Sequence, residues 1–129
     1  MTTTTSTTGL STIGQISMNA RDIPRAVKFY RDSLGMRLLF EAPPKMAFFD
    51  CHGVRLMLSL PETPEYDHAG SVLYFRVDDI EGTHAAFTER GVAFVDQPHL
   101  VARMPDHELW MTFFKDTEGN TLALMAEMR

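Results

Sequence analysis

The stretch Ile16-Ser-Met-Asn-Ala-Arg-Asp22-Ile23 decides the fold, because its pattern returns at Leu73-Tyr-Phe-Arg-Val-Asp-Asp79-Ile80. In both copies a short apolar strand pattern runs into an Asp that precedes an apolar residue, as an N-cap does at the start of a helix. The helical patterns that follow stop at Gly35 and Gly91, and glycine is the usual left-handed residue after a helix. Each copy therefore predicts a strand followed by a helix.

Each copy then continues with three more strands. Residues 36–41 and 92–96 predict one strand after each helix, and residues 46–58 and 111–124 each predict a hairpin around a glycine-containing turn. The predicted fold class is α+β, with two tandem β-α-β-β-β modules. One helix covers only one face of such a sheet, so the modules are expected to form a half-barrel cup whose inner face holds a ligand.

The domain organisation follows from the same repeat. Residues 13–129 are expected to form a single domain, with module one at 13–60 and module two at 71–127. The linker between them, 61–70, is rich in Pro, Glu, Asp and Gly. Residues 1–12 are almost all Thr, Ser and Gly and are expected to be a disordered tail.

Composition excludes several classes of function. The net charge of −5 and the lack of a Lys/Arg cluster argue against nucleic-acid binding. No apolar run approaches the ~20 residues that span a bilayer, so no membrane partner is expected. Cys51 is the sole cysteine, which excludes an internal disulfide and suits a reducing compartment. We therefore expect a cytoplasmic protein.

These motifs resemble the vicinal oxygen chelate superfamily, which includes glyoxalase I, extradiol dioxygenases, fosfomycin-inactivating enzymes and bleomycin-resistance proteins. The resemblance rests on the stretches 13–23, 26–30, 34–36 and 114–124, and it extends from Ile13 to Glu127. It implies paired β-α-β-β-β modules and, usually, a homodimer. Modules pair within one chain or between two chains in this superfamily, and the sequence leaves both arrangements open.

The resemblance also implies where a divalent metal binds in the metal-dependent members. The four inward strand positions look like Gln15, Met57, Val72 and Ala123, and the internal repeat pairs Gln15 with Val72 and Met57 with Ala123. A Zn, Ni, Mn or Fe site needs three or four O, N or S donors. Val72 and Ala123 have no donor atom and Met57 offers only a thioether. We therefore expect no metal at these positions and no cofactor.

Other side chains are expected to line the pocket in place of a metal. Residues two apart on a strand share a face and lie about 7 Å apart, which places further residues beside the four inward positions. The expected ligand-binding residues are Gln15, Ser17, Met57, Val72, Trp110, Thr121 and Ala123. Arg55 is a candidate to clamp a carboxylate or to stabilise an oxyanion, and Tyr74 is a candidate donor of a hydrogen bond or a proton.

The segment 97–110 is interpreted as a long connection in module two that can form a lid over the cavity. It contains His107, the candidate general base, since histidine titrates near neutrality. It also contains Trp110. The alternative interpretation is a solvated loop with Trp110 in the core.

Three hypotheses about function remain open. The first is a metal-independent, glyoxalase-like lyase or isomerase that acts on a small oxygenated metabolite. The second is non-catalytic ligand binding, such as drug sequestration by bleomycin-resistance proteins. The third is a metal-dependent glyoxalase or dioxygenase with atypical ligands, such as Gln15 with His99, His107 or Glu108. All three imply a small-molecule ligand and, through the resemblance, a homodimer.

Overall fold

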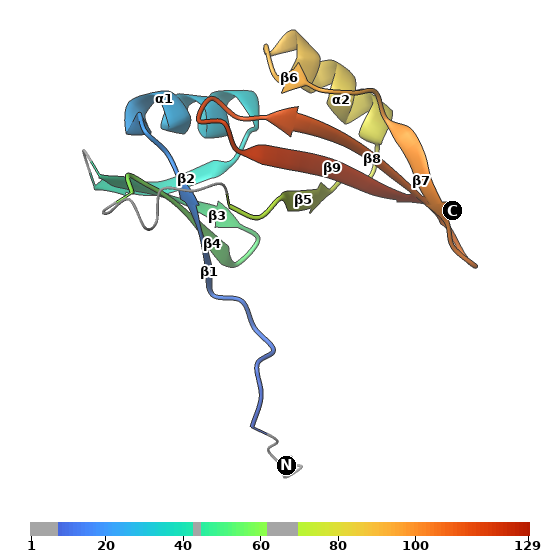
Figure 1. Ribbon diagram of the computed structural model, residues 1–129, viewed down its shortest axis with the longest axis horizontal. Coiled ribbons are helices and arrows are strands. Elements are labelled where there is room, and N and C mark those ends of the chain that lie inside the picture. Colours follow the sequence, from blue (N-terminus) through green and yellow to red (C-terminus); the bar gives the residue numbers. More distant parts are fainter. Residues whose placement is uncertain (1–7, 43–44, 62–69) are drawn as a thin grey trace.

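The computed structural model describes residues 8–42, 45–61 and 70–129 and contains two sheets, each with a helical layer on the same side (Figure 1). Residues 1–7 of the expected tail and 62–69 of the expected linker lie outside the described residues. Within the described part of the chain, no helix is long and apolar enough to cross a membrane.

Module one follows the predicted order of elements. It contains β1 (Gln15–Asn19), α1 (Ile23–Lys28), the π-helical turn η1 (Phe29–Ser33), β2 (Arg37–Ala42), β3 (Met46–Cys51) and β4 (Val54–Ser59). The strand order in the sheet is β1-β4-β3-β2, with β1 parallel to β4 and the remaining pairs antiparallel.

Module two repeats this arrangement with an additional strand. It contains β5 (Leu73–Arg76), α2 (Ile80–Glu89), β6 (Ala93–Phe94), β7 (His99–Arg103), β8 (Glu108–Lys115) and β9 (Thr121–Met128). The strand order is β5-β9-β8-β6, β5 is parallel to β9, and β7 also pairs with β8. The predicted α+β fold with two β-α-β-β-β modules is therefore confirmed.

The expectation of a long lid loop at 97–110 is wrong. Most of this segment belongs to β7 and to the start of β8, and only the residues from 104 to 107 connect the two strands. The physical reason is the shortness of β6, which ends at Phe94. Beyond it the outer edge of β8 has backbone groups without a strand partner, and β7 pairs with them.

Both helices begin and end where the repeat predicts. The Asp22 carboxylate accepts a hydrogen bond from the Arg25 backbone N–H at 3.0 Å, and Asp79 accepts one from the Gly82 N–H at 3.0 Å. After the helices, Gly35 and Gly91 adopt φ values of 73° and 88°, which favour glycine.

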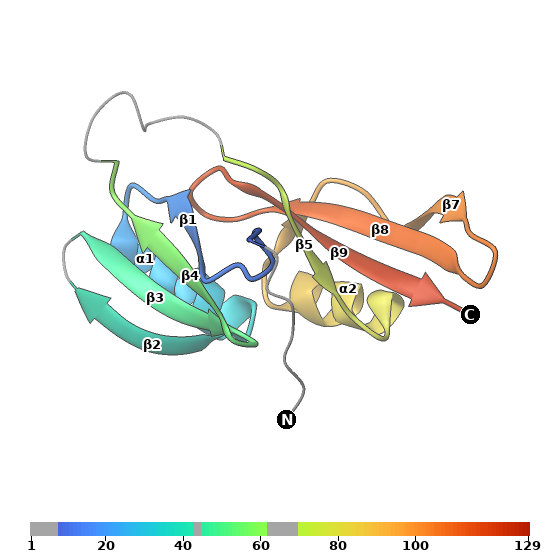
Figure 2. The same ribbon diagram turned by 90° about the horizontal axis from the view of Figure 1, so that it is seen from below.

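Side chains alternate between the two faces of each sheet. The face under the helices holds the core, whose largest buried side chains include Tyr30, Phe49, Phe114, Leu56 and Leu122. The opposite face of each sheet points away from the helices, and we call it the open face (Figure 2). In β1, β4 and β9 the buried side chains that face the helices alternate with those of the open face.

The turn between β8 and β9, residues 116–120, lies against α1 and joins the two modules (Figure 1). The Tyr30 hydroxyl donates a hydrogen bond to Asp116 Oδ2 at 2.7 Å, and Asn120 Nδ2 donates one to the Asn19 carbonyl at 2.9 Å. The Glu118 carboxylate accepts bonds from the Arg25 guanidinium and from two backbone N–H groups at the start of α1. These contacts tie module two to module one within a single chain.

Candidate ligand-binding faces

The open face of module one is centred on Met57. The strand register places Ser17 of β1 on one side of it and Phe48 of β3 on the other. Gln15 Nε2 donates a weak hydrogen bond to the Met57 sulfur at 3.8 Å. The centre of this face is therefore a thioether rather than an oxygen or nitrogen ligand.

An aromatic pair extends this face towards β2. The ring of Phe40 stacks on that of Phe48, with a centroid distance of 4.5 Å and an interplanar angle of 25°. A register shift at Leu39 brings Phe40 opposite Phe48. Phe48 is buried, whereas Phe40 is 50% exposed, so the pair presents one ring surface to solvent.

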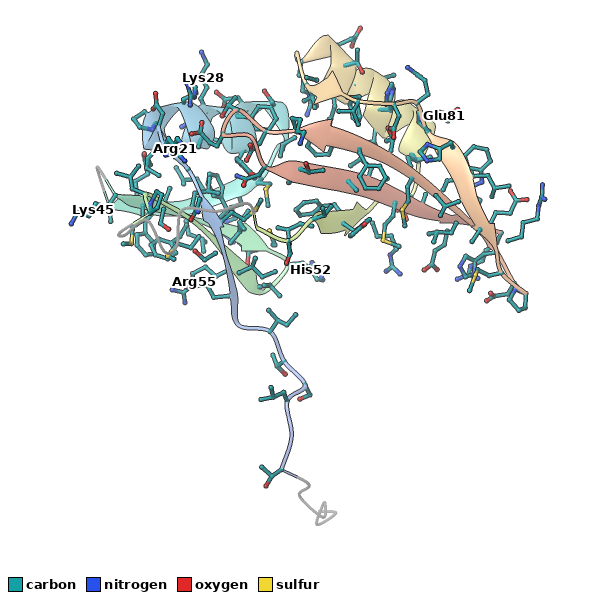
Figure 3. The ribbon with its side chains drawn as sticks, in the orientation of Figure 1. Arg21, Lys28, Lys45, His52, Arg55 and Glu81 are labelled. Atoms are coloured by element: carbon teal, nitrogen blue, oxygen red, sulfur yellow. The ribbon has the colours of Figure 1, made fainter. Side chains whose placement is uncertain are left out.

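Arg55 lies on the same face, opposite Asp50 and Gln15 in the register. Its guanidinium carbon lies 5.7 Å from the centroid of the Phe48 ring, within the range of a cation–π contact. Figure 3 shows the Arg55 side chain on the side of the sheet away from α1. The nearby Asp50 carboxylate instead accepts a hydrogen bond from the Gly53 N–H at 3.0 Å.

A cavity of about 480 Å³ lies at the other end of the module-one face. Polar and apolar side chains share its lining, which includes Ser17, Asn19, Lys45, Met46, Met57 and Ser59. The volume is within the ~300–1,000 Å³ typical of small-molecule sites. Thioethers adapt to ligands of irregular shape, so Met46 and Met57 suit contact with an apolar ligand.

The open face of module two is centred on Ala123, between Tyr74 of β5 and Phe113 of β8. The rings of Tyr74 and Phe113 meet edge to face, 5.9 Å apart at an interplanar angle of 80°. Because the two outer strands lie about 10 Å apart, the rings reach each other only above a small side chain. Ala123 is fully buried, and Tyr74 remains 49% exposed.

Most of the predicted ligand-binding residues lie on these two open faces. Gln15, Ser17 and Met57 lie on the face of module one, and Thr121 and Ala123 lie on that of module two. Val72 directly precedes β5, and Tyr74 and Arg55, predicted as catalytic, lie on the open faces as well.

The expectation that Trp110 lines the ligand face is wrong. In the register Trp110 lies opposite Leu100 and Ala126, on the helix-covered side of the sheet. It packs against the hydrophobic core, and its Nε1–H donates to Glu108 Oε1 at 3.2 Å. Of the alternative interpretation, the structure supports the core position of Trp110 but not the solvated loop, since Trp110 belongs to β8.

His107 is separated from the other two catalytic candidates. It lies in the turn between β7 and β8, at the end of the molecule remote from module one (Figure 1). Its Nδ1 lies 2.7 Å from Asp106 Oδ1. The structure therefore does not bring Arg55, Tyr74 and His107 together within one chain.

The donor set does not fit a divalent metal. Within residues 8–42, 45–61 and 70–129, no group of three or more His, Cys, Asp or Glu side chains is placed to hold an ion. Of the four inward positions, Ala123 has no donor and lies beneath two rings, and Met57 offers a thioether. These positions therefore do not offer the three or four donors that metal-assisted chemistry needs.

Cys51 is also unsuited to nucleophilic chemistry. Burial raises the pKa of its thiol to about 11, and the nearby Asp50 carboxylate adds to the effect. A thiol with such a pKa carries almost no thiolate at neutral pH.

Sequence reasoning missed Phe40, Phe48 and Phe113 as components of the open faces. The signal for two of them was present, because Phe48 and Phe113 precede core residues and must therefore point to the other side. Phe40 could not be placed this way, since the register shift at Leu39 changes the alternation of β2.

Comparison with known proteins agrees with this architecture. A family model described as "Glyoxalase/Bleomycin resistance protein/Dioxygenase superfamily" matches residues 12–124. A glyoxylase-like domain-containing protein from Didymella fabae is 32% identical over 124 residues, covering 87% of this chain and 91% of the relative. The uncharacterized protein YraH from Bacillus subtilis is 25% identical over 126 residues, covering 85% and 94%.

Solved structures show the same fold. Lactoylglutathione lyase from Agrobacterium tumefaciens superposes with a TM-score of 0.74 at 22% identity, covering 92% of this chain and 96% of that one. An antibiotic binding protein from Streptomyces sp. CB03234 superposes with a TM-score of 0.72 at 25% identity, covering 94% and 99%. The match of the family model to nearly the whole chain is decisive. This chain belongs to the glyoxalase/bleomycin resistance protein/dioxygenase superfamily.

Proposed function

We propose that this protein binds a flat, largely apolar small molecule on its open faces and releases it unchanged. The observation that carries the proposal is the pair of aromatic contacts, Phe40–Phe48 in module one and Tyr74–Phe113 in module two. Both lie beside the inward positions where metal-dependent relatives would place ligands. Aromatic pairs with a ligand ring contribute about 0.5–1.5 kcal/mol each beyond the burial of area.

Two further features favour binding over turnover. Of the positions that would hold a metal, Met57 offers a thioether and Ala123 a methyl group, and the catalytic candidates Arg55, Tyr74 and His107 come from separated parts of the chain. The likeness to an antibiotic binding protein supports the same choice. A metal-independent lyase or isomerase is the rival that the experiment below distinguishes.

The proposal includes a homodimer in the cytoplasm. In a single chain, Phe40 and Tyr74 are each about half exposed, at 50% and 49%. A second copy that places its module-two face over module one brings the two aromatic pairs to opposite sides of one ligand. Sedimentation at several concentrations tests this arrangement, and a monomer that binds ligand with full affinity contradicts it.

The test uses flat polycyclic probes, such as anthraquinones, in calorimetric titrations of the wild-type chain. We expect saturable binding, a probe recovered unchanged by chromatography, and a loss of about tenfold or more in affinity in Phe48→Ala. Val101→Ala is the matched control, since Val101 is exposed on β7. No binding, or equal loss in both variants, contradicts the binding proposal, and a transformed probe establishes turnover instead.

A further inference from the structure

Arg55 presents its guanidinium on the open face of module one, beside the Phe40–Phe48 pair. Among the residues that the structure describes, its guanidinium makes the cation–π contact with Phe48 and no ion pair. Asp50 is the acidic residue directly opposite in the register, and its Oδ1 accepts the Gly53 N–H. Five N–H donors of a planar group are thus available beside an aromatic platform.

The position of this guanidinium is set by its neighbours. The side chain lies over the ring of Phe48, which itself is covered on its other flank by Phe40. A flat ligand that lies along the edge of the Phe40–Phe48 pair would place one end against Phe40 and bring a substituent at its other end to the guanidinium. An arginine held against a ring loses little freedom when it binds, and its fork matches a carboxylate with two parallel hydrogen bonds.

The matched position in module two lacks this property. The internal repeat pairs Arg55 with Thr121. Arg55 lies on β4 beside β1, and Thr121 lies at the equivalent position of β9 beside β5. The Thr121 hydroxyl accepts a hydrogen bond from Lys115 Nζ at 2.6 Å. The matched position of module two therefore holds a hydroxyl that already accepts a hydrogen bond, whereas module one holds a guanidinium there.

We infer that Arg55 is a specificity-determining residue, and that the natural ligand carries a carboxylate at the edge of its flat apolar body. This inference rests on the proposed function and narrows its ligand class. An acidic chain with a net charge of −5 repels anions at long range. Arg55 is the cation that contacts the aromatic pair, so we expect Arg55, rather than Lys45 in the cavity at the other end of the face, to decide whether an anionic ligand is accepted.

The test compares two probes of the same shape, anthraquinone-2-carboxylate and anthraquinone-2-carboxamide, by calorimetric titration of the full chain. We expect wild-type protein to prefer the carboxylate by about tenfold. In Arg55→Gln we expect the preference to disappear, because the affinity for the carboxylate falls to about that for the carboxamide. Arg55→Lys, which retains the charge without the fork, keeps part of the preference.

Arg31→Gln is the matched control, because it changes the net charge equally at an exposed site on η1 that pairs with Asp32. The carboxylate preference of Arg31→Gln should equal that of the wild type. Thermal melts should show that every variant is folded. If the carboxylate preference survives in Arg55→Gln, or is absent in wild-type protein that binds both probes, the inference is wrong and the proposed function stands. If wild-type protein binds neither probe, the proposed function itself fails.

Discussion

The open faces of the two modules share the same strand register, but the positions of large and small side chains are reversed between them. Module one places Ser17, Met57 and Phe48 across three neighbouring strands, and module two places Tyr74, Ala123 and Phe113 at the same points. In module one the large Met57 lies at the centre beside the small Ser17. In module two the small Ala123 lies at the centre beside the large Tyr74. Both solutions leave apolar surface and neither provides a set of metal donors.

The turns at the ends of the two hairpins differ in a second way. In module one the turn after Cys51 contains His52 and Gly53 with positive φ, and its Gly53 N–H donates to Asp50 in the same hairpin. In module two the buried Asp116 stands where module one has Cys51, and its turn contacts α1. One turn therefore serves its own hairpin, while the other holds the two modules together.

The largest effect is expected from breaking this turn. In Asp116→Ala the Tyr30 hydroxyl and the N–H groups of Glu118 and Asn120 lose their acceptor. Buried donors without partners cost about 1–3 kcal/mol each, so we expect the free energy of unfolding to fall by about 3 kcal/mol or more. Urea denaturation measures it. Cys51→Ala, the matched change in module one, should lower the free energy of unfolding by about 1 kcal/mol or less. Equal losses of stability in the two variants would contradict the different roles given to the two turns.

The next effect tests the exchange of sizes. Ala123→Leu forces a larger side chain beneath the Tyr74–Phe113 contact, and overpacking of this kind costs about 1–3 kcal/mol. Met57→Leu, the matched change in module one, conserves volume and should cost less than about 1.5 kcal/mol. Thermal unfolding of both variants gives the comparison. If leucine is tolerated at both positions, the Tyr74–Phe113 contact does not explain why position 123 is alanine.

Much of the fold follows from sequence because its signals are local. The Asp caps, the Gly stops and the two-residue alternation each involve residues a few positions apart, so reading the chain suffices. The same alternation also indicates on which side of the sheet Trp110 lies. Trp110 precedes the buried residues Thr112 and Phe114 by two and four positions, so it shares their face. The prediction of a loop for this segment left no strand alternation to apply.

The features that sequence could not provide depend on distant partners. The contact of Tyr30 with Asp116 joins residues far apart in the chain, and a carboxylate in a turn normally serves that turn alone. The Phe40–Phe48 stack depends on a register shift that no residue type marks. The candidate site is therefore predictable as a set of face residues, but not as two aromatic pairs.

A smaller effect concerns the acid stability of the module-two turn. Burial opposes ionisation of Glu118, but hydrogen bonds from Arg25, Thr117 and two backbone N–H groups outweigh it and lower its pKa to about 2. Since the unfolded value is about 4.3, the ionised carboxylate stabilises the fold above that pH. This stabilisation is lost as the pH falls towards 2.

We therefore expect Glu118→Gln to be less stable than wild type at pH 6, with a difference that narrows between pH 5 and pH 2. Urea denaturation at each pH measures the difference. A constant difference over that range would show that the Glu118 charge does not contribute to the docking of the turn.

The smallest effect lies in module one. With a pKa of about 11, Cys51 carries about 100-fold less thiolate at pH 8.5 than an unfolded cysteine with a pKa near 8.5. Modification by a thiol reagent should therefore be slow in native protein and fast in guanidinium chloride. Rapid modification of the native chain would mean that the helix-covered side of this module opens readily.

The central claim is that the aromatic pairs of the two open faces bind a ligand without a metal ion. The most direct test is the dissociation constant of anthraquinone-2-carboxylate measured with protein treated with EDTA and with protein supplied with Zn²⁺, Ni²⁺, Mn²⁺ or Fe²⁺. We expect the same dissociation constant in every case. Binding that is lost with the chelator and restored by one stoichiometric ion would contradict it.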